Sequence, residues 1–162
     1  MRLEWMTLWF AMVSSAAPPS GEVLRNYVPT ELGRIDRSGD AVIQPDGAAV
    51  SATYLDLSSR RTIAVSIATV SDPVVEKAKY KVWGDGQSPL RTASGEFGGF
   101  VVAGVPGGYF WTETSGIVAS EAVVLIGDAL LVKVAVTPAK DAEEPTRLLK
   151  ELDLAGLRKL LP

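Results

Sequence analysis

The sequence predicts a single α+β domain: an antiparallel sheet of about five or six strands, a helix after the first hairpin, and C-terminal helices packed on the sheet. Two pairs of segments with alternating apolar side chains support this prediction, 48–57 with 62–70 and 117–126 with 129–136. A segment with helix-capping residues follows the first pair, and leucine-rich segments of helical period close the chain. The length of 162 residues suits one domain.

Residues 1–17 have the layout of a secretory signal peptide. Arg2 precedes an apolar run from Trp5 to Val13, and small residues follow, with cleavage expected after Ala16. The apolar run is too short to span a bilayer, and the absence of cysteine excludes a lipoprotein anchor. We therefore expect an exported protein, periplasmic or secreted and not lipid-anchored, with no transmembrane segment after signal removal. A cytoplasmic protein is the alternative if residues 1–17 are retained.

The predicted domain begins after a linker. Residues 18–21 have the composition of a linker, and 22–162 form the domain. Residues 22–28 indicate a short amphipathic helix that ends before Pro29, and 34–47 are rich in turn residues. The alternating segments 48–57 and 62–70 then form the first predicted hairpin.

Residues 72–83 fit either a helix or a strand. Asp72 suits an N-cap, Pro73 the first helical position and Gly84 the C-terminal cap, so a helix is favoured. Lysines at alternate positions 77, 79 and 81 fit a strand instead. On a helix, four apolar residues form a stripe that we expect to face the core: Val74, Val75, Ala78 and Val82.

The segment 94–116 contains seven glycines and a Tyr-Phe-Trp run. Gly99 and Gly104 have the spacing of a phosphate-binding loop, but Val105 and Pro106 follow where that loop requires Lys and then Ser or Thr, and no helix is predicted after the segment. Residues 105–108 fit a type II turn, with Pro106 and Gly107 at its centre, and a strand is predicted over 109–114. The glycines are therefore predicted to serve turns and close strand packing.

The C-terminal segments complete the predicted fold. Gly127 and Asp128 are expected to join strands 117–126 and 129–136. Acidic residues precede basic ones in 141–152, as the helix dipole favours, and the leucines of 153–161 recur at helical spacing.

The composition excludes several chemistries. Cysteine and histidine are both absent, so thiol catalysis, thiolate metal sites and histidine general bases are excluded. The net charge of −3 gives no basic surface of the kind that binds nucleic acid. We expect no cofactor, no metal and no nucleic-acid partner. Glu96, Glu113 and Glu121 could supply a carboxylate pair for a hydrolase or lyase, although their spacing does not place two of them together.

Four aromatic residues are the candidate ligand-binding side chains: Tyr80, Trp83, Tyr109 and Trp111. Tyr109 and Trp111 share one strand face, and Tyr80 and Trp83 lie together on the predicted helix. The two pairs could line a cleft for a flat or apolar ligand, or could pack the helix onto the sheet.

The leading hypothesis is a non-enzymatic, exported accessory or binding module that contacts an unidentified protein or a small amphipathic ligand. A small-ligand or lipid carrier is the second hypothesis, because a continuous apolar cavity between helix and sheet would suit it. A carboxylate-dependent enzyme is the third.

The order of short motifs adds a resemblance. Residues 24–33 (LRNYVPTELG), 104–107 (GVPG) and 152–157 (LDLAGL) occur in an order that resembles a group of uncharacterised bacterial exported proteins. Their layout is similar to the PsbP/Mog1-like α+β fold. The chain departs from the group's Leu-Pro motif at Val28, and Arg34 follows Gly33 where the group has an aromatic residue. The resemblance implies export and a fold, and it carries no catalytic motif.

Overall fold

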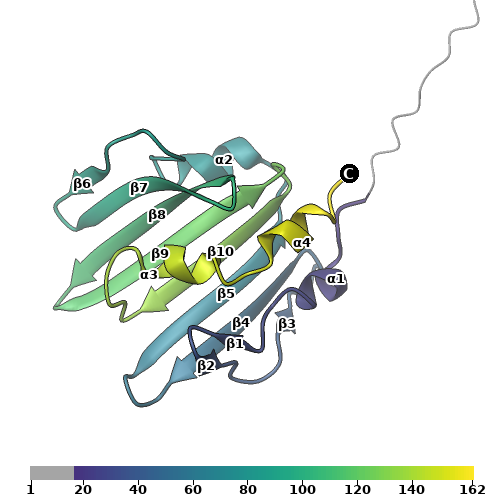
Figure 1. Ribbon diagram of the computed structural model, residues 1–162, viewed down its shortest axis with the longest axis horizontal. Coiled ribbons are helices and arrows are strands. Elements are labelled where there is room, and N and C mark those ends of the chain that lie inside the picture. The colour runs from purple at the N-terminus through teal and green to yellow at the C-terminus, as the bar shows by residue number, and fades with distance from the viewer. Residues whose placement is uncertain (1–16) are drawn as a thin grey trace, which may run out of the picture.

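The computed structural model describes residues 17–162, which form a twisted eight-stranded antiparallel sheet with short helices against it (Figure 1). The predicted signal peptide falls almost entirely outside the described residues. Across the sheet the order is β3 (Val42–Ile43), β4 (Ala49–Asp56), β5 (Arg61–Thr69), β10 (Leu130–Thr137), β9 (Ile117–Ile126), β8 (Val105–Thr114), β7 (Gly95–Val102) and β6 (Leu90–Thr92). The other elements are α1 (Gly21–Arg25), the two-stranded sheet of β1 (Glu31–Leu32) and β2 (Ile35–Asp36), α2 (Pro73–Ala78), α3 (Glu144–Leu149) and α4 (Leu154–Arg158).

The predicted α+β class with five or six strands is wrong. Strands make up 43% and helices 15% of the described chain, so the protein is mostly β. The short strands β1, β2, β3 and β6 have two or three residues each, too few to show an alternating pattern in the sequence. The two predicted hairpins are confirmed, β4 with β5 and β9 with β10.

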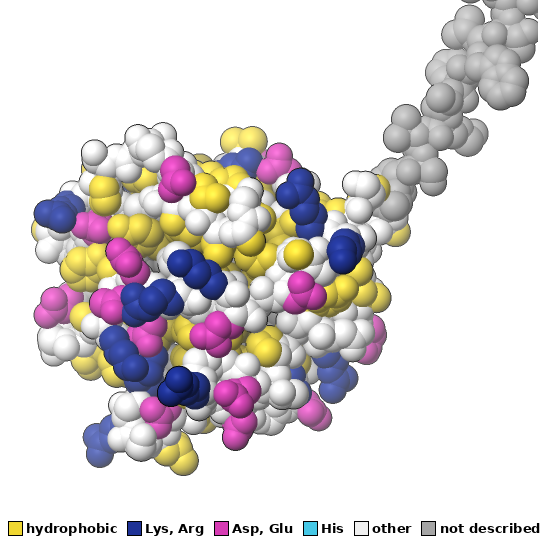
Figure 2. All heavy atoms as spheres, in the orientation of Figure 1, with side chains coloured by type: hydrophobic (Ala, Val, Ile, Leu, Met, Phe, Trp, Pro, Cys, Tyr) yellow, Lys and Arg dark blue, Asp and Glu magenta, His cyan; other side chains and the backbone are white. Residues whose placement is uncertain are grey.

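The core lies on one face of the sheet, which α1, α3 and α4 cover (Figure 1). Side chains alternate along a strand, so every second residue faces the helices. The buried residues of the adjacent strands β4, β5 and β10 on this face are Val50, Ala52, Tyr54, Ile63, Val65, Ile67, Leu130, Val132, Val134 and Val136. The helices add Leu24, Leu148, Leu149, Leu154 and Leu157. On this side of the molecule, Lys and Arg side chains gather with Asp and Glu over α3 and the β1–β2 turn (Figure 2).

Helix α2 and the residues after it lie against the opposite face of the sheet. Asp72 caps the helix as predicted, accepting from the N–H groups of Val74 and Val75 at 3.0 and 3.1 Å. The predicted core-facing stripe is wrong, because Val74 and Val75 are 74% and 53% exposed. The helix ends after six residues, and the buried contacts with the sheet come instead from the following segment, through Tyr80 and Val82.

The predicted turn over 105–108 is also wrong, because these residues begin strand β8. The β7–β8 turn is formed by Ala103 and Gly104, whose φ angles are 50° and 74°. Two successive residues with positive φ are typical of the tight hairpin turns that match strand twist. The prediction that the segment's glycines allow close packing is confirmed at Gly107, where an added Cβ would lie 2.4 Å from the carbonyl oxygen of Val123.

Tyr54 makes the free energy of unfolding depend on pH in the alkaline range. Its hydroxyl donates to the carbonyl oxygen of Pro29 at 2.6 Å, and burial raises the pKa of Tyr54 to about 12 from its ordinary value of 10.0. Because the pKa is raised in the folded state, the stabilisation is complete below pH 10 and is lost as pH rises through 12. We expect this loss to reach about 1–2 kcal/mol in the free energy of unfolding.

Urea unfolding at about pH 8 and pH 11 tests this dependence. Tyr54→Phe should lower stability by about 1 kcal/mol at the lower pH, through the lost hydrogen bond. Its stability should then fall less with pH than that of the natural protein. Equal falls in the two proteins would contradict the assignment to Tyr54.

Candidate functional site

The four predicted aromatic residues lie on two different faces of the sheet. Tyr80 and Trp83 pack together with their ring centroids 6.0 Å apart. An added Cβ on Gly108 would lie 2.8 Å from Tyr80 and 3.1 Å from Trp83, so this pair occupies the face to which Gly108 belongs. Tyr109 and Trp111 alternate with Gly108 along β8 and therefore face the other side. The two pairs do not line a common cleft.

Tyr80 makes a buried polar contact on the α2 side. Its hydroxyl donates to Glu121, whose other carboxylate oxygen lies 3.3 Å from Nζ of Lys133. Burial, and then the hydrogen bond to Glu121, raise the pKa of Tyr80 far above its usual range. Tyr80 is therefore a neutral donor that fastens the segment after α2 to the sheet. The Nε1–H of Trp83 is buried beside it and has no acceptor within the described chain.

Tyr109 belongs to a polar cluster near the β6 edge of the sheet. Glu96 accepts from Nε of Arg91 at 2.8 Å and from the Tyr109 hydroxyl at 2.7 Å, one donor on each carboxylate oxygen. These donors, Arg91 foremost, hold the pKa of Glu96 below its usual range. Glu96 therefore stays ionised at neutral pH and cannot donate a proton as a general acid.

The three glutamates considered for acid–base chemistry do not meet at one place. Glu96 and Glu113 line the same open hollow of about 410 Å³, together with Trp111. Glu121 lies on the opposite face, because Glu121 pairs with Phe110 across the β8–β9 ladder whereas Trp111 is the next residue along.

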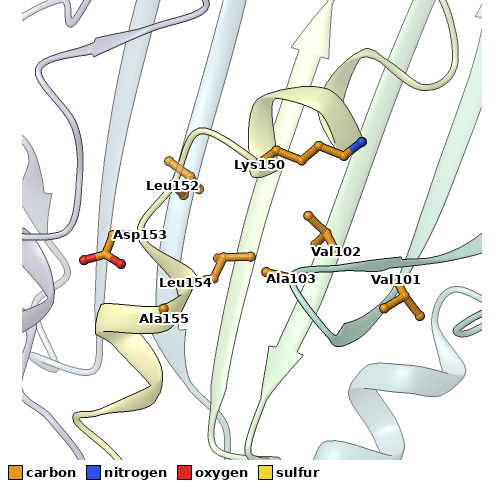
Figure 3. A pocket seen from close by; sticks show the side chains of 8 residues that line it. All are labelled: Val101, Val102, Ala103, Lys150, Leu152, Asp153, Leu154 and Ala155. Atoms are coloured by element: carbon orange, nitrogen blue, oxygen red, sulfur yellow. The ribbon is translucent and has the colours of Figure 1, made fainter.

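A more apolar hollow of about 340 Å³ lies between the end of β7 and the segment that joins α3 to α4. Figure 3 shows the Leu154 side chain directed toward Ala103, with Val102 beside them. The Lys150 side chain extends from the end of α3 on the side of the hollow where Val102 lies (Figure 3). Asp153 points away from this group (Figure 3). Its carboxylate accepts from the N–H of Gly156 at 2.7 Å, which caps the first turn of α4.

A neighbouring hollow of about 410 Å³ shares three of these residues and continues along α4. We refer to the two together as the β7–α4 groove, lined by Val101, Val102, Ala103, Val105, Lys150, Leu152, Asp153, Leu154, Ala155, Arg158 and Lys159. Helix α4 contributes to the groove because its residues have different environments. Leu154 and Leu157 are buried against the core, whereas Ala155 and Arg158 are exposed and line the groove beside the β7–β8 turn.

The groove combines an apolar floor with unpaired positive charge. Its cations are Lys150, Arg158 and Lys159, and none of them forms an ion pair within the described residues. Its acidic residue, Asp153, is engaged in capping α4. The groove therefore offers apolar contacts together with a positive potential, a combination that suits an amphipathic anion.

Sequence reasoning missed this groove. Its apolar residues come from segments about 50 positions apart. Of its cations, Lys150 was interpreted only through the dipole of the helix predicted over 141–152, and Arg158 and Lys159 were not considered. One feature of the sequence could have indicated the groove: Lys150, Arg158 and Lys159 border a leucine-rich segment that has few acidic residues to form ion pairs with them.

Comparisons with known proteins give no relative: no family model, no curated protein and no solved structure matches the chain. The resemblance to bacterial exported proteins and to the PsbP/Mog1-like layout therefore stays a prediction. In residues 17–162, no group of acidic side chains is arranged to hold a metal ion, and no helix has the length and apolar character needed to cross a membrane.

Proposed function

We propose that the protein is a binding module that holds a small amphipathic anion in the β7–α4 groove. The apolar part of the ligand would lie against Val102 and Leu154, and its anionic head beside Lys150 or Arg158. The observation that carries the proposal is the pairing of an apolar floor with three cations that have no acidic partner in the described chain. The site differs from the predicted one, which lay beside α2.

The two parts of the groove would contribute differently to affinity. Apolar burial contributes about 25 cal/mol per Å² removed from water, so the alkyl part supplies most of the binding free energy. Charges near a surface are screened over about 8 Å at physiological ionic strength. The cations therefore act on a head group in close contact and select anionic over neutral ligands.

Within the described chain, the groove offers no free carboxylate for acid–base catalysis. Catalysis by acid and base needs a group that is free to exchange a proton with the ligand. The carboxylate of Asp153 points away from the groove floor and accepts an N–H of its own helix. Lysine, arginine and aliphatic side chains make up the rest of the lining.

Calorimetric titration with dodecanoate tests the proposal. We expect dodecanoate to bind saturably. Dodecanol has the same alkyl chain without the charge and should bind at least about tenfold more weakly, which corresponds to about 1.4 kcal/mol of binding free energy from the head group. Lys150→Glu and Arg158→Glu should weaken dodecanoate binding and leave dodecanol binding unchanged. Ala155→Trp, at an exposed position of the groove, should abolish the binding of both ligands.

Arg60→Glu is the matched control. Arg60 is exposed in the β4–β5 turn, so the substitution makes the same change of charge outside the groove. It should bind dodecanoate as the natural protein does. Equal affinities in Ala155→Trp and the natural protein would overturn the placement of the site, and equal binding of dodecanoate and dodecanol would overturn the role of the cations.

We further propose that the module acts outside the cytoplasm. This proposal rests on the signal-peptide layout of residues 1–17. Mass spectrometry of the N-terminus of the protein from its native host tests it. A mature chain that begins at Ala17 would support export, and a chain that retains Met1 would contradict it.

A further inference from the structure

Another, more polar hollow of about 400 Å³ lies where three distant segments meet. The β1–β2 turn, the start of β5 and helix α3 with the residues before it form its walls. We call it the Arg61 groove, lined by Gly33, Arg34, Arg61, Lys140, Glu144, Arg147, Leu148 and Glu151. It lies in the region where basic and acidic side chains gather over α3 and the β1–β2 turn (Figure 2).

The β1–β2 turn is held tightly against α3. Gly33 and Arg34 both have positive φ, 60° and 64°. The N–H of Gly33 donates to Glu151 at 3.0 Å, and an added Cβ on Gly33 would lie 2.8 Å from Leu148. This close contact, at a positive φ that favours glycine, brings Arg34 to the rim of the groove.

Arg61 is the most unusual residue of the groove, because its side chain is only 10% exposed. Its terminal nitrogen pairs with Glu144, which is 8% exposed. The other oxygen of Glu144 accepts from the N–H of Lys140 at 2.6 Å. The Nε–H of Arg61 is buried and has no acceptor in the described part of the chain. One carboxylate therefore serves a buried guanidinium and a backbone donor at once.

The other charges of the groove leave an excess of positive charge. Arg34 and Lys140 form no ion pair within residues 17–162, and Arg147 pairs with Asp141 at 2.7 Å at the exposed rim. The two lining carboxylates are engaged, Glu144 by Arg61 and Glu151 by Gly33. The groove thus holds more donors than acceptors.

We propose that the Arg61 groove binds a phosphate group, held by Arg34, Lys140 and the guanidinium of Arg61. Guanidinium groups donate paired hydrogen bonds to phosphate oxygens, and lysine adds a compact positive charge. A bound phosphate would supply a counter-charge to Arg34 and Lys140, next to a buried cation that a single carboxylate compensates. The proposal involves none of the residues of the β7–α4 groove and does not depend on its ligand.

NMR titration of the ¹⁵N-labelled protein tests the proposal with two probes, inorganic phosphate and glycerol 3-phosphate. Sodium chloride keeps the ionic strength constant, so that general screening does not change during the titration. We expect saturable shifts at the Gly33 and Lys140 amides and at the side-chain Nε–H of Arg61. Saturation by both probes identifies the phosphate group as the recognised unit, and saturation by the ester alone identifies a phosphomonoester.

Arg34→Gln and Lys140→Gln should each weaken phosphate binding at least tenfold, since both residues are exposed and neither contributes to the core. Arg60→Gln is the control, because it removes an equal charge outside the groove, and it should bind as the natural protein does. Shifts that do not saturate with either probe would overturn the proposal, as would variants at Arg34 and Lys140 that bind with unchanged affinity.

Discussion

Glu144→Gln is expected to lower the free energy of unfolding by about 3–5 kcal/mol, the largest effect that we predict for a side chain of this protein. The substitution keeps the size of the side chain and removes its charge. Arg61 would then be a buried cation without a counter-ion, because its Nε–H already lacks an acceptor in the described chain. Removing one member of a buried pair costs more than the pair contributes, since the remaining charge stays away from water.

Urea unfolding followed by circular dichroism measures this effect. Glu143→Gln is the matched control, because it neutralises the preceding residue, which is exposed and makes no side-chain cap. We expect it to change stability by less than about 0.5 kcal/mol. The double variant Arg61→Met with Glu144→Leu should recover most of the loss, since apolar pairs of similar volume often replace buried ion pairs without cost. A loss below about 1 kcal/mol in Glu144→Gln would show that the pair is well solvated.

The main hairpins were predictable because their sequence pattern matches their environment. β5 and β10 alternate buried and more exposed residues, as a sheet covered by helices on one face requires. The turn at Gly127 and Asp128 was also predicted, and both residues have positive φ, as a tight hairpin turn needs. Here the local sequence and the tertiary structure favour the same conformation.

The α2 region shows where local sequence was insufficient. The capping residues at Asp72 and Pro73 set the start of the helix, and that part of the prediction is confirmed. Its end and its buried side depend on the sheet instead. The glycines of β7 and β8 leave room for Tyr80 and Trp83, so the segment after the helix packs there and Val75 remains exposed. No pattern within 72–83 carries this information.

The candidate sites were harder to predict than the strands. That Tyr109 and Trp111 share a face followed from strand geometry. That Tyr80 lies on the opposite face depends on which side of β8 the α2 segment crosses, and only the fold determines this. The β7–α4 groove depends in the same way on the placement of α4 beside the β7–β8 turn, which brings Leu154 to Ala103 (Figure 3).

Gly99→Ala is the second substitution expected to have a large effect, a loss of about 2–3 kcal/mol in the free energy of unfolding. An added Cβ would lie 2.1 Å from the carbonyl oxygen of Gly84 and 2.8 Å from its nitrogen. Both are backbone atoms, so no rotation of a side chain relieves the contact. The N–H of Gly84 also donates to the carbonyl oxygen of Gly107 at 2.8 Å, which anchors the segment to β8.

Relief of the clash requires the segment to move away from the sheet, which would withdraw Tyr80 and Val82 from their buried positions. The hydrogen bond from Tyr80 to Glu121 would be broken with them. Gly104→Ala separates this effect from backbone strain. The φ of Gly104 is 74° and no atom lies within 4 Å of an added Cβ. We therefore expect a loss of about 1–2 kcal/mol in the free energy of unfolding, from the backbone conformation alone. Urea unfolding compares the two variants, and near-ultraviolet circular dichroism reports on Tyr80 and Trp83. The dichroism should change in Gly99→Ala alone, because only that substitution displaces the aromatic pair from the sheet. Equal spectra and equal stabilities in the two variants would show that the segment after α2 does not pack on β7.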